Sequence, residues 1–150
     1  MYRQAGVRRA YYSAFRPIGD TPLAGVNATP PLREHRLYQA DFMLRQYGFT
    51  ADELPYDAQG NLPTVQNPKL AWAERNPERF PVEVNRAPLA ILLRVPGIGP
   101  AGAAALVQAR RQSPLRDLRD LEKLGIRAQQ AAPFILLAGH APSYQLKLFT

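Results

Sequence analysis

The stretch Val95-Pro96-Gly97-Ile98-Gly99-Pro100, within the apolar segment 84–111, decides the fold. Proline is tolerated in the first turn of a helix but not in its interior. We therefore predict a first helix that is capped by Asn85 and ends near Arg94. A tight hairpin follows, and a second helix begins at Pro100. The small residues at 102–104 allow these two helices to cross closely.

The predicted hairpin has the features of an anion site. We expect both of its glycines to adopt positive φ and to bring the backbone close to a ligand, while the isoleucine between them points into the core. Free N–H groups of the hairpin and of the following helical turn then face outward, where they suit a phosphate oxygen. Bulkier residues at both glycines are expected to abolish binding while the fold survives. The predicted binding residues are Arg94, Pro96, Gly97, Ile98, Gly99, Ala101, Gly102, Arg110, Arg111 and Arg127.

This pattern resembles the helix-hairpin-helix motif of DNA repair glycosylases, ligases, Holliday-junction proteins and competence DNA receptors. The resemblance covers about 30 residues and implies contacts to DNA phosphates, which carry no base information. Many members have Lys or Arg just after the second glycine, whereas this chain has Pro100-Ala101-Gly102. The alternative is a helical hairpin that only packs or binds protein.

A weaker second copy follows the first. Leucines at 115, 118, 121 and 124 form an apolar stripe, and Asp117 and Asp120 lie near the predicted helix start. Gly125-Ile126-Arg127 then resembles a hairpin whose second glycine is replaced by arginine. Because arginine resists positive φ, we expect this copy to be structural rather than binding. The segment 134–137 is predicted to return to the core.

Composition and charge narrow the function. The 150 residues include 19 Lys and Arg against 12 Asp and Glu, a net charge of +7, and nine basic against three acidic residues fall in 85–150. This suggests a polyanionic partner, here DNA as duplex or junction. The absence of Cys excludes disulfides, thiolate-held zinc or iron–sulfur clusters and a thiol nucleophile. No apolar run is long enough for a membrane span, so we expect a cytoplasmic protein with no membrane contact.

The rest of the chain contains short elements. We predict a strand over 10–16, a loop over 17–31, and a helix over 32–47 that Thr29 caps and Gly48 ends. A capped turn follows at 50–53, and a helix runs from Asn67 to about Arg75. The expected fold is mainly α, with a short N-terminal strand and loop, a helical middle and a C-terminal helix-hairpin-helix domain. The expected divisions are 1–76, a linker at 77–84, the hairpin domain at 85–138 and a tail at 139–150.

A second resemblance spans about Tyr2 to Phe134. It is carried by Tyr11-Tyr12-Ser13-Ala14-Phe15-Arg16-Pro17-Ile18, Thr21-Pro22-Leu23, the segment 31–42, Asn67-Pro68-Lys69-Leu70-Ala71-Trp72-Ala73 and Phe80-Pro81-Val82-Glu83-Val84-Asn85. Together with the hairpin, these are similar to the C-terminal third of DNA modification and repair radical S-adenosylmethionine proteins linked to uracil-DNA glycosylase-like partners. The resemblance implies that 1–76 holds the last strand of a β/α barrel and a helical segment. The family's Cys-x3-Cys-x2-Cys motif is absent here.

Other chemistry has little support in the sequence. His35 and His140 have no metal-ligand spacing, and Glu34 and Asp41 on one helix face are better explained as solvated carboxylates than as an acid/base pair. We expect no enzyme activity from this chain and no cofactor. The expected function is DNA binding without sequence specificity, in DNA repair or modification. The alternatives are a detached accessory region of a radical S-adenosylmethionine enzyme, with its barrel or a glycosylase-like protein as partner, and a protein adaptor that uses residues 30–76.

Overall fold

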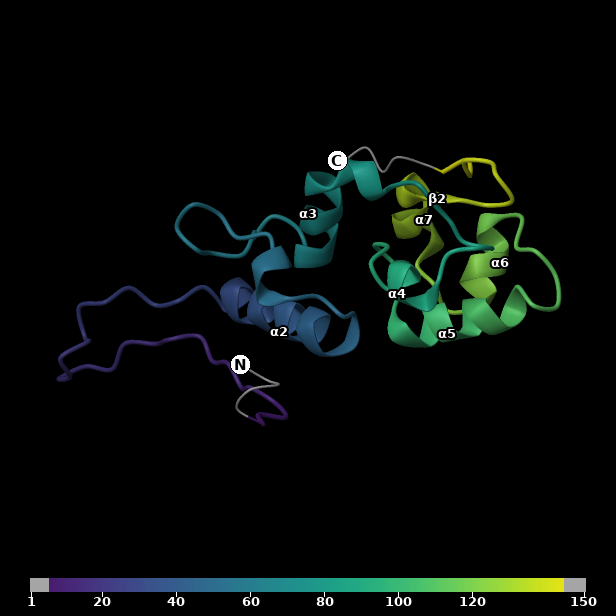
Figure 1. Cartoon of the computed structure of the whole chain (residues 1–150). Coiled ribbons are helices and arrows are strands. Elements are labelled where there is room, and N and C mark those ends of the chain that lie inside the picture. The colour runs from purple at the N-terminus through teal and green to yellow at the C-terminus, as the bar shows by residue number, and fades with distance from the viewer. Residues whose placement is uncertain (1–5, 145–150) are drawn as a thin grey trace.

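The computed structural model describes residues 6–144, and these are mainly helical, as predicted. Figure 1 shows α2 and α3 on one side of the molecule and α4 to α7 on the other. No helix in this part of the chain is both long and apolar enough to cross a membrane. The elements are α2 (Pro31–Gln46), η1 (Ala51–Glu53), α3 (Pro68–Arg75), η2 (Pro77–Arg79), β1 (Val82–Glu83), α4 (Leu89–Leu92), α5 (Pro100–Ala109), α6 (Leu118–Lys123), α7 (Ala128–Ala131), η3 (Ala132–Phe134) and β2 (Ile135–Leu136).

Two clusters of buried side chains form the core. The first lies under α2 and α3 and includes Met43, Phe49 and Trp72. The second lies among α4 to α7 and the short sheet. Phe80 and Phe134 are packed against both clusters, and their ring centroids are 5.2 Å apart. The two halves of the molecule are therefore in direct apolar contact.

Capping residues set several helix starts where the sequence predicts them. The Asn67 side chain accepts a hydrogen bond from the Leu70 N–H at 2.9 Å, and Pro68 occupies the first turn of α3. Capping boxes begin η1 at Thr50 and α6 at Asp117. Helix α2 departs from the prediction, because its N-cap is Pro30 and not Thr29.

Residues 10–16 do not form the predicted strand. They run alongside α2 in Figure 1 without regular structure, and their backbone groups bond to side chains of that helix. The Tyr12 N–H donates to the Tyr38 hydroxyl at 3.0 Å, and the Ala14 N–H donates to Glu34 Oε2 at 2.8 Å. A strand requires a neighbouring strand for its ladder, and here the neighbour is a helix.

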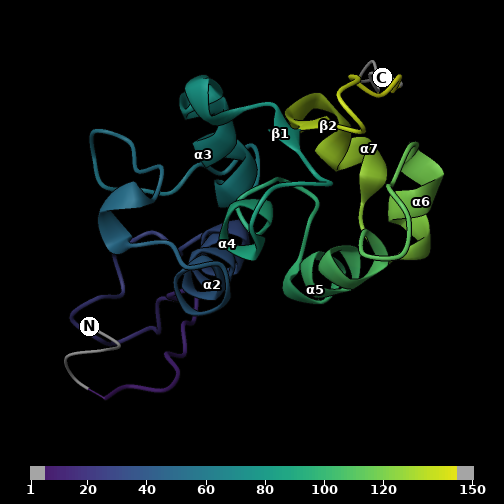
Figure 2. The same ribbon diagram turned by 45° about the vertical axis from the view of Figure 1, so that its right-hand side comes forward.

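The segment 77–84 is not the extended linker that the sequence predicts. It contains η2 and β1, and β1 lies next to β2 (Figure 2). The two strands pair in parallel, with Val82 opposite Ile135. Val82 and Val84 are buried in the second core cluster, as is Ile135 from the predicted core segment 134–137. Asn85 does not cap α4, which begins only at Leu89. Its side chain instead holds the backbone N–H and carbonyl of Leu115.

Candidate nucleic-acid interface

The first hairpin, residues 93–99, connects α4 to α5 and has one of its two predicted positive φ angles. Gly97 has a φ of +83°, whereas Gly99 has a φ of −95° and forms the N-cap of α5. Ile98 is buried in the core, as predicted, and Pro100 begins α5. Only Gly97 therefore requires glycine for its backbone conformation.

Several backbone N–H groups of this hairpin and of the first turn of α5 have no acceptor in the fold. Gly99 accepts the first helical bond, from the Ala103 N–H, at 2.8 Å. Within residues 6–144, no acceptor bonds the N–H groups of Gly97, Gly99, Ala101 or Gly102. These donors lie at the positive end of the α5 dipole, which favours an anion.

The second hairpin packs directly against the first. Gly125 has a φ of +75° and is followed by the buried Ile126, matching Gly97 and Ile98. The Arg127 N–H donates to the Gly97 carbonyl at 3.1 Å. A Cβ on Gly102 would lie 2.7 Å from Ile126 Cγ1, so Gly102 allows α5 to approach this hairpin closely.

The expected obstacle at Arg127 does not exist. This residue has a φ of −76°, and Gly99 at the matching place in the first hairpin also has negative φ. The second hairpin nevertheless differs from the first, because its backbone N–H groups have acceptors within the fold. Its N–H groups at Arg127 and Ala128 bond to the Gly97 and Ile126 carbonyls, and the Arg127 side chain is exposed.

The four predicted arginines divide into two pairs. Arg111 and Arg127 are exposed. Arg110 is half-buried and donates to the carbonyls of Val84 and Ala87 at 2.9 and 2.6 Å. It therefore ties α5 to the segment before α4. One nitrogen of its guanidinium is therefore engaged within the fold.

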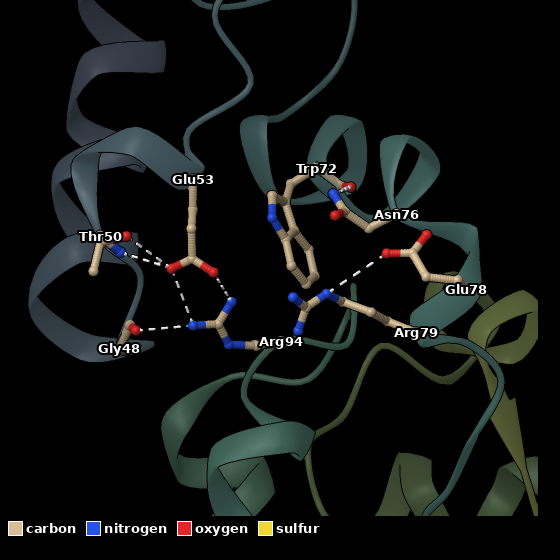
Figure 3. A network of polar contacts seen from close by, with 8 residues as sticks. All are labelled: Gly48, Thr50, Glu53, Trp72, Asn76, Glu78, Arg79 and Arg94. Atoms are coloured by element: carbon tan, nitrogen blue, oxygen red, sulfur yellow. Dashed lines mark hydrogen bonds and ion pairs between the residues drawn. The ribbon is translucent and has the colours of Figure 1, made fainter.

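Arg94 is also structural. Figure 3 shows its guanidinium pointing at Glu53, with which it forms an ion pair, and at the Gly48 carbonyl, to which it donates at 3.1 Å. The guanidinium also lies 4.4 Å from the centroid of the Phe49 ring. Arg94 thus fastens the hairpin half to the α2–α3 half and is not free to bind phosphate.

We predict that Glu53→Gln lowers the free energy of unfolding by about 1–2 kcal/mol at pH 7. The Arg94 side chain holds the pKa of Glu53 at about 2, below its usual 4.5. The carboxylate therefore contributes stability above pH 4.5 that is lost as the pH falls toward 2. Water screens the pair, because its side chains are 18% and 24% exposed.

Urea unfolding at pH 7 and pH 3 measures this effect. The control is Glu78→Gln, which removes the exposed Glu78–Arg79 pair in Figure 3. We expect less than about 0.5 kcal/mol from it. Equal losses from both variants would show that the Glu53–Arg94 pair does not fasten the two halves.

A cleft of about 470 Å³ separates the hairpins from α2 and the start of α3. One wall is formed by Tyr38, Phe42 and Tyr47 of the α2 region. The facing wall contains both hairpins. The residues it contributes are Gly97, Ile98, Gly99, Gly125, Arg127 and Gln130.

Lys69 of α3 lines this cleft and is buried. Its ammonium nitrogen donates to the Ile98 carbonyl at 2.6 Å and lies 4.0 Å from the centroid of the Tyr47 ring. Burial lowers the pKa of Lys69 to about 7. The side chain therefore links α3 to the tip of the first hairpin and is poised to lose its charge near neutral pH.

We predict that Lys69 makes the protein more stable as the pH rises from about 7.5 to about 9.5. Over this interval the unfolded chain holds a proton on Lys69 that the folded chain has lost, so raising the pH favours the folded state. The expected gain in the free energy of unfolding is about 1–2 kcal/mol over these two pH units. One proton can contribute at most about 1.4 kcal/mol for each pH unit. Urea unfolding measures it, with Lys69→Met as the control. A Lys69→Met variant with the same rise would assign the effect to another group.

Lys69 and the cleft were not predicted from the sequence. One signal was available, because Asn67 and Pro68 place this lysine in the first turn of α3, where the helix dipole disfavours a cation. Within residues 6–144, no group of three or more His, Asp or Glu could hold a metal ion. His35 lies on α2, and His140 lies on a turn near the C-terminus.

The two α2 carboxylates, which the sequence places on one helix face, are engaged separately. Glu34 accepts the Ala14 N–H, and Asp41 is buried and pairs with Arg45 at 2.8 Å. Asp41 is therefore not the solvated carboxylate that the sequence suggests.

The chain was compared with protein-family models, with curated proteins and with solved structures, and none of the three comparisons finds a match.

Proposed function

We propose that the protein binds the phosphate backbone of DNA, without reading its base sequence, through the surface that the two hairpins form. The observation that carries this proposal is the pairing of the hairpins. The bond from the Arg127 N–H to the Gly97 carbonyl joins the two hairpins, and the exposed Arg127 lines the same cleft as Gly97 and Gly99, whose N–H groups have no acceptor within residues 6–144. Backbone N–H groups and an arginine side chain, both of which can donate hydrogen bonds to phosphate, thus share one surface.

Charge supports the same proposal. Residues 85–150 carry nine basic and three acidic residues, and the exposed Arg111 and Arg127 belong to this block. No acidic residue is among those that line the cleft within the described chain. An electropositive surface of this kind attracts a polyanion.

The donors also favour binding without sequence preference. Backbone N–H groups and arginines that contact phosphates set the position of a protein on DNA but carry no base information. The role in DNA repair or modification is part of the proposal and rests on the helix-hairpin-helix resemblance. The cytoplasm as its compartment is likewise proposed.

Titration of two labelled duplexes of about 20 base pairs and unrelated sequence tests this function. We expect similar affinities for both, in the micromolar range near about 0.1 M salt, and weaker binding as salt is added. A strong preference for one sequence would replace backbone binding by base recognition. No binding to either duplex at low salt would refute the proposed function.

A second candidate function is an accessory region for a catalytic chain, as the radical S-adenosylmethionine resemblance implies. The observation that favours it is the segment before α2, which exposes Tyr11, Ile18, Leu23 and Val26 and forms no sheet. Apolar side chains on such a segment suit a protein partner. The test is to examine the gene for an in-frame Cys-x3-Cys-x2-Cys upstream of Met1; a stop codon between such a motif and Met1 would contradict it.

A further inference from the structure

We propose that the cleft between α2 and the two hairpins receives one unpaired nucleotide of the bound DNA. The protein would then prefer DNA that carries an unpaired nucleotide to fully paired duplex. This inference rests on the proposed function and names the kind of DNA that the same surface selects. It is carried by the size of the cleft, by its two chemically different walls and by its charge.

The cleft has the dimensions of a ligand site. Its volume of about 470 Å³ lies within the range of about 300–1,000 Å³ that small-molecule sites occupy. It adjoins the proposed phosphate-binding surface, because Gly97, Gly99 and Arg127 belong to both. A nucleotide that enters it remains connected to a backbone held by the hairpins.

The wall formed by α2 is aromatic. Phe42 keeps 40% of its surface exposed, although its neighbour Met43 is buried in the first core cluster. Its ring meets the Tyr47 ring edge to face at a centroid distance of 5.4 Å. Tyr38 lines the same wall. Aromatic side chains of this kind stack on unpaired bases of any sequence, with a contribution to affinity that is measurable for each base.

The facing wall is cationic and rich in N–H donors. Burial raises the pKa of Tyr47, and the positive charge of Arg127 offsets part of the rise, so the guanidinium lies within electrostatic reach of the aromatic wall. The Gly97 and Gly99 N–H groups lack acceptors within residues 6–144. A phosphate fits these donors, and a base fits the aromatic rings opposite.

Charge complementarity selects a nucleotide over an apolar peptide. The ionisable groups that line the cleft within the described chain are Lys69, Arg127 and tyrosines, and carboxylates are absent among them. A ligand that combines a planar aromatic group with an anion satisfies both walls. Duplex DNA keeps its bases stacked and paired, so an unpaired nucleotide presents its base to the α2 wall at the lowest cost in free energy.

Fluorescence anisotropy compares a labelled duplex with the same duplex carrying one extra, unpaired thymidine. We expect the bulged duplex to bind about 10-fold more tightly than the paired one. Phe42→Ala is expected to remove most of this preference and to leave the affinity for paired duplex unchanged. The matched control is Tyr56→Ala, because Tyr56 is 42% exposed but does not line the cleft.

A second variant separates the loss of stacking from a loss of the fold. Phe42→Leu keeps apolar bulk on α2 and removes the aromatic face, so loss of the preference in this variant assigns the effect to stacking. Excess thymidine 5′-monophosphate forms a further arm. We expect it to leave the bulged complex intact, because a free nucleotide lacks the flanking phosphates; displacement would make the cleft a site for free nucleotides and overturn the proposal.

The two proposals fail in different ways. If neither duplex binds, the proposed function is wrong. If both duplexes bind with equal affinity, or if Phe42→Ala and Phe42→Leu keep the wild-type preference, DNA binding stands and the nucleotide cleft is wrong.

Discussion

Replacing Gly97 with alanine is expected to lower the free energy of unfolding by about 3 kcal/mol or more. A Cβ at this position would lie 2.7 Å from the Arg127 carbonyl oxygen and 3.0 Å from the Ala131 nitrogen. Both atoms belong to the backbone of the second hairpin and the helix that follows it, and they cannot move aside cheaply. The φ of +83° adds the strain of a side chain in the left-handed region.

Two other glycines separate the causes of this loss. Gly125 has a φ of +75°, but a Cβ there would meet no atom within 4 Å, so Gly125→Ala should cost only the backbone strain, about 1 kcal/mol. Gly99 has ordinary φ, and the nearest contact of its Cβ would be the Tyr47 hydroxyl at 3.8 Å. Gly99→Ala should therefore change stability by less than about 0.5 kcal/mol.

Urea unfolding of the three variants gives the ranking. We expect Gly97→Ala to lose most, Gly125→Ala less and Gly99→Ala least. It follows that bulkier residues at Gly97 and Gly99 do not form a clean binding test, contrary to the expectation from sequence, because the change at Gly97 disturbs the fold itself. Equal stabilities for Gly97→Ala and Gly125→Ala would mean that the two hairpins are not in close contact.

Charge reversal at Arg127 has the largest expected effect on DNA binding. Arg127→Glu should weaken binding to paired duplex about 30-fold, because a phosphate ligand is lost and a repelling carboxylate takes its place. The stability of the folded state should change by less than about 0.5 kcal/mol, since the bond to Gly97 uses the backbone N–H of Arg127 and not its side chain.

Arg119→Glu provides the matched control. Arg119 is an exposed residue of α6 that does not line the cleft, and its reversal changes the net charge by the same amount. We expect it to weaken binding only about threefold, through the overall field. Anisotropy titrations of both variants in the same buffer measure the difference. Equal losses would mean that net charge, and not the hairpin surface, determines the affinity.

The sequence predicts the parts of this structure that local chemistry determines. Caps and prolines fix the starts of α3 and α5, as Asn67 and Pro100 show, and Gly48 marks the end of α2. Asp117 begins α6 through a capping box. Each of these signals acts within a few residues of the chain, so no tertiary structure is needed to interpret it.

Contacts between distant segments could not be predicted in this way. Arg94 lies in the segment that the motif marks as phosphate-binding, yet its partner Glu53 belongs to another part of the chain. Arg110 is likewise held by carbonyls that precede α4. The prediction of a strand over 10–16 was wrong for a related reason, since a strand depends on a neighbour that its own residues do not specify.

The candidate site depends both on local sequence signals and on contacts between distant segments. Gly97 and the hairpin follow from sequence, whereas the cleft exists because α2 is packed opposite them. Lys69 and the exposed Phe42 acquire their places only through that packing. A pattern of about 30 residues therefore predicts the hairpin on which the proposed phosphate site is built, but not the cleft that faces it.

The salt dependence of duplex binding, measured for the wild type and for Arg127→Ala, tests the central claim most directly. Each phosphate that the protein neutralises contributes about −0.9 to the slope of log K against log salt. We predict a negative slope for the wild type and a slope shallower by about one for Arg127→Ala, with the fold intact. A wild-type affinity that does not depend on salt, or identical slopes for the two proteins, would contradict DNA backbone binding by the paired hairpins.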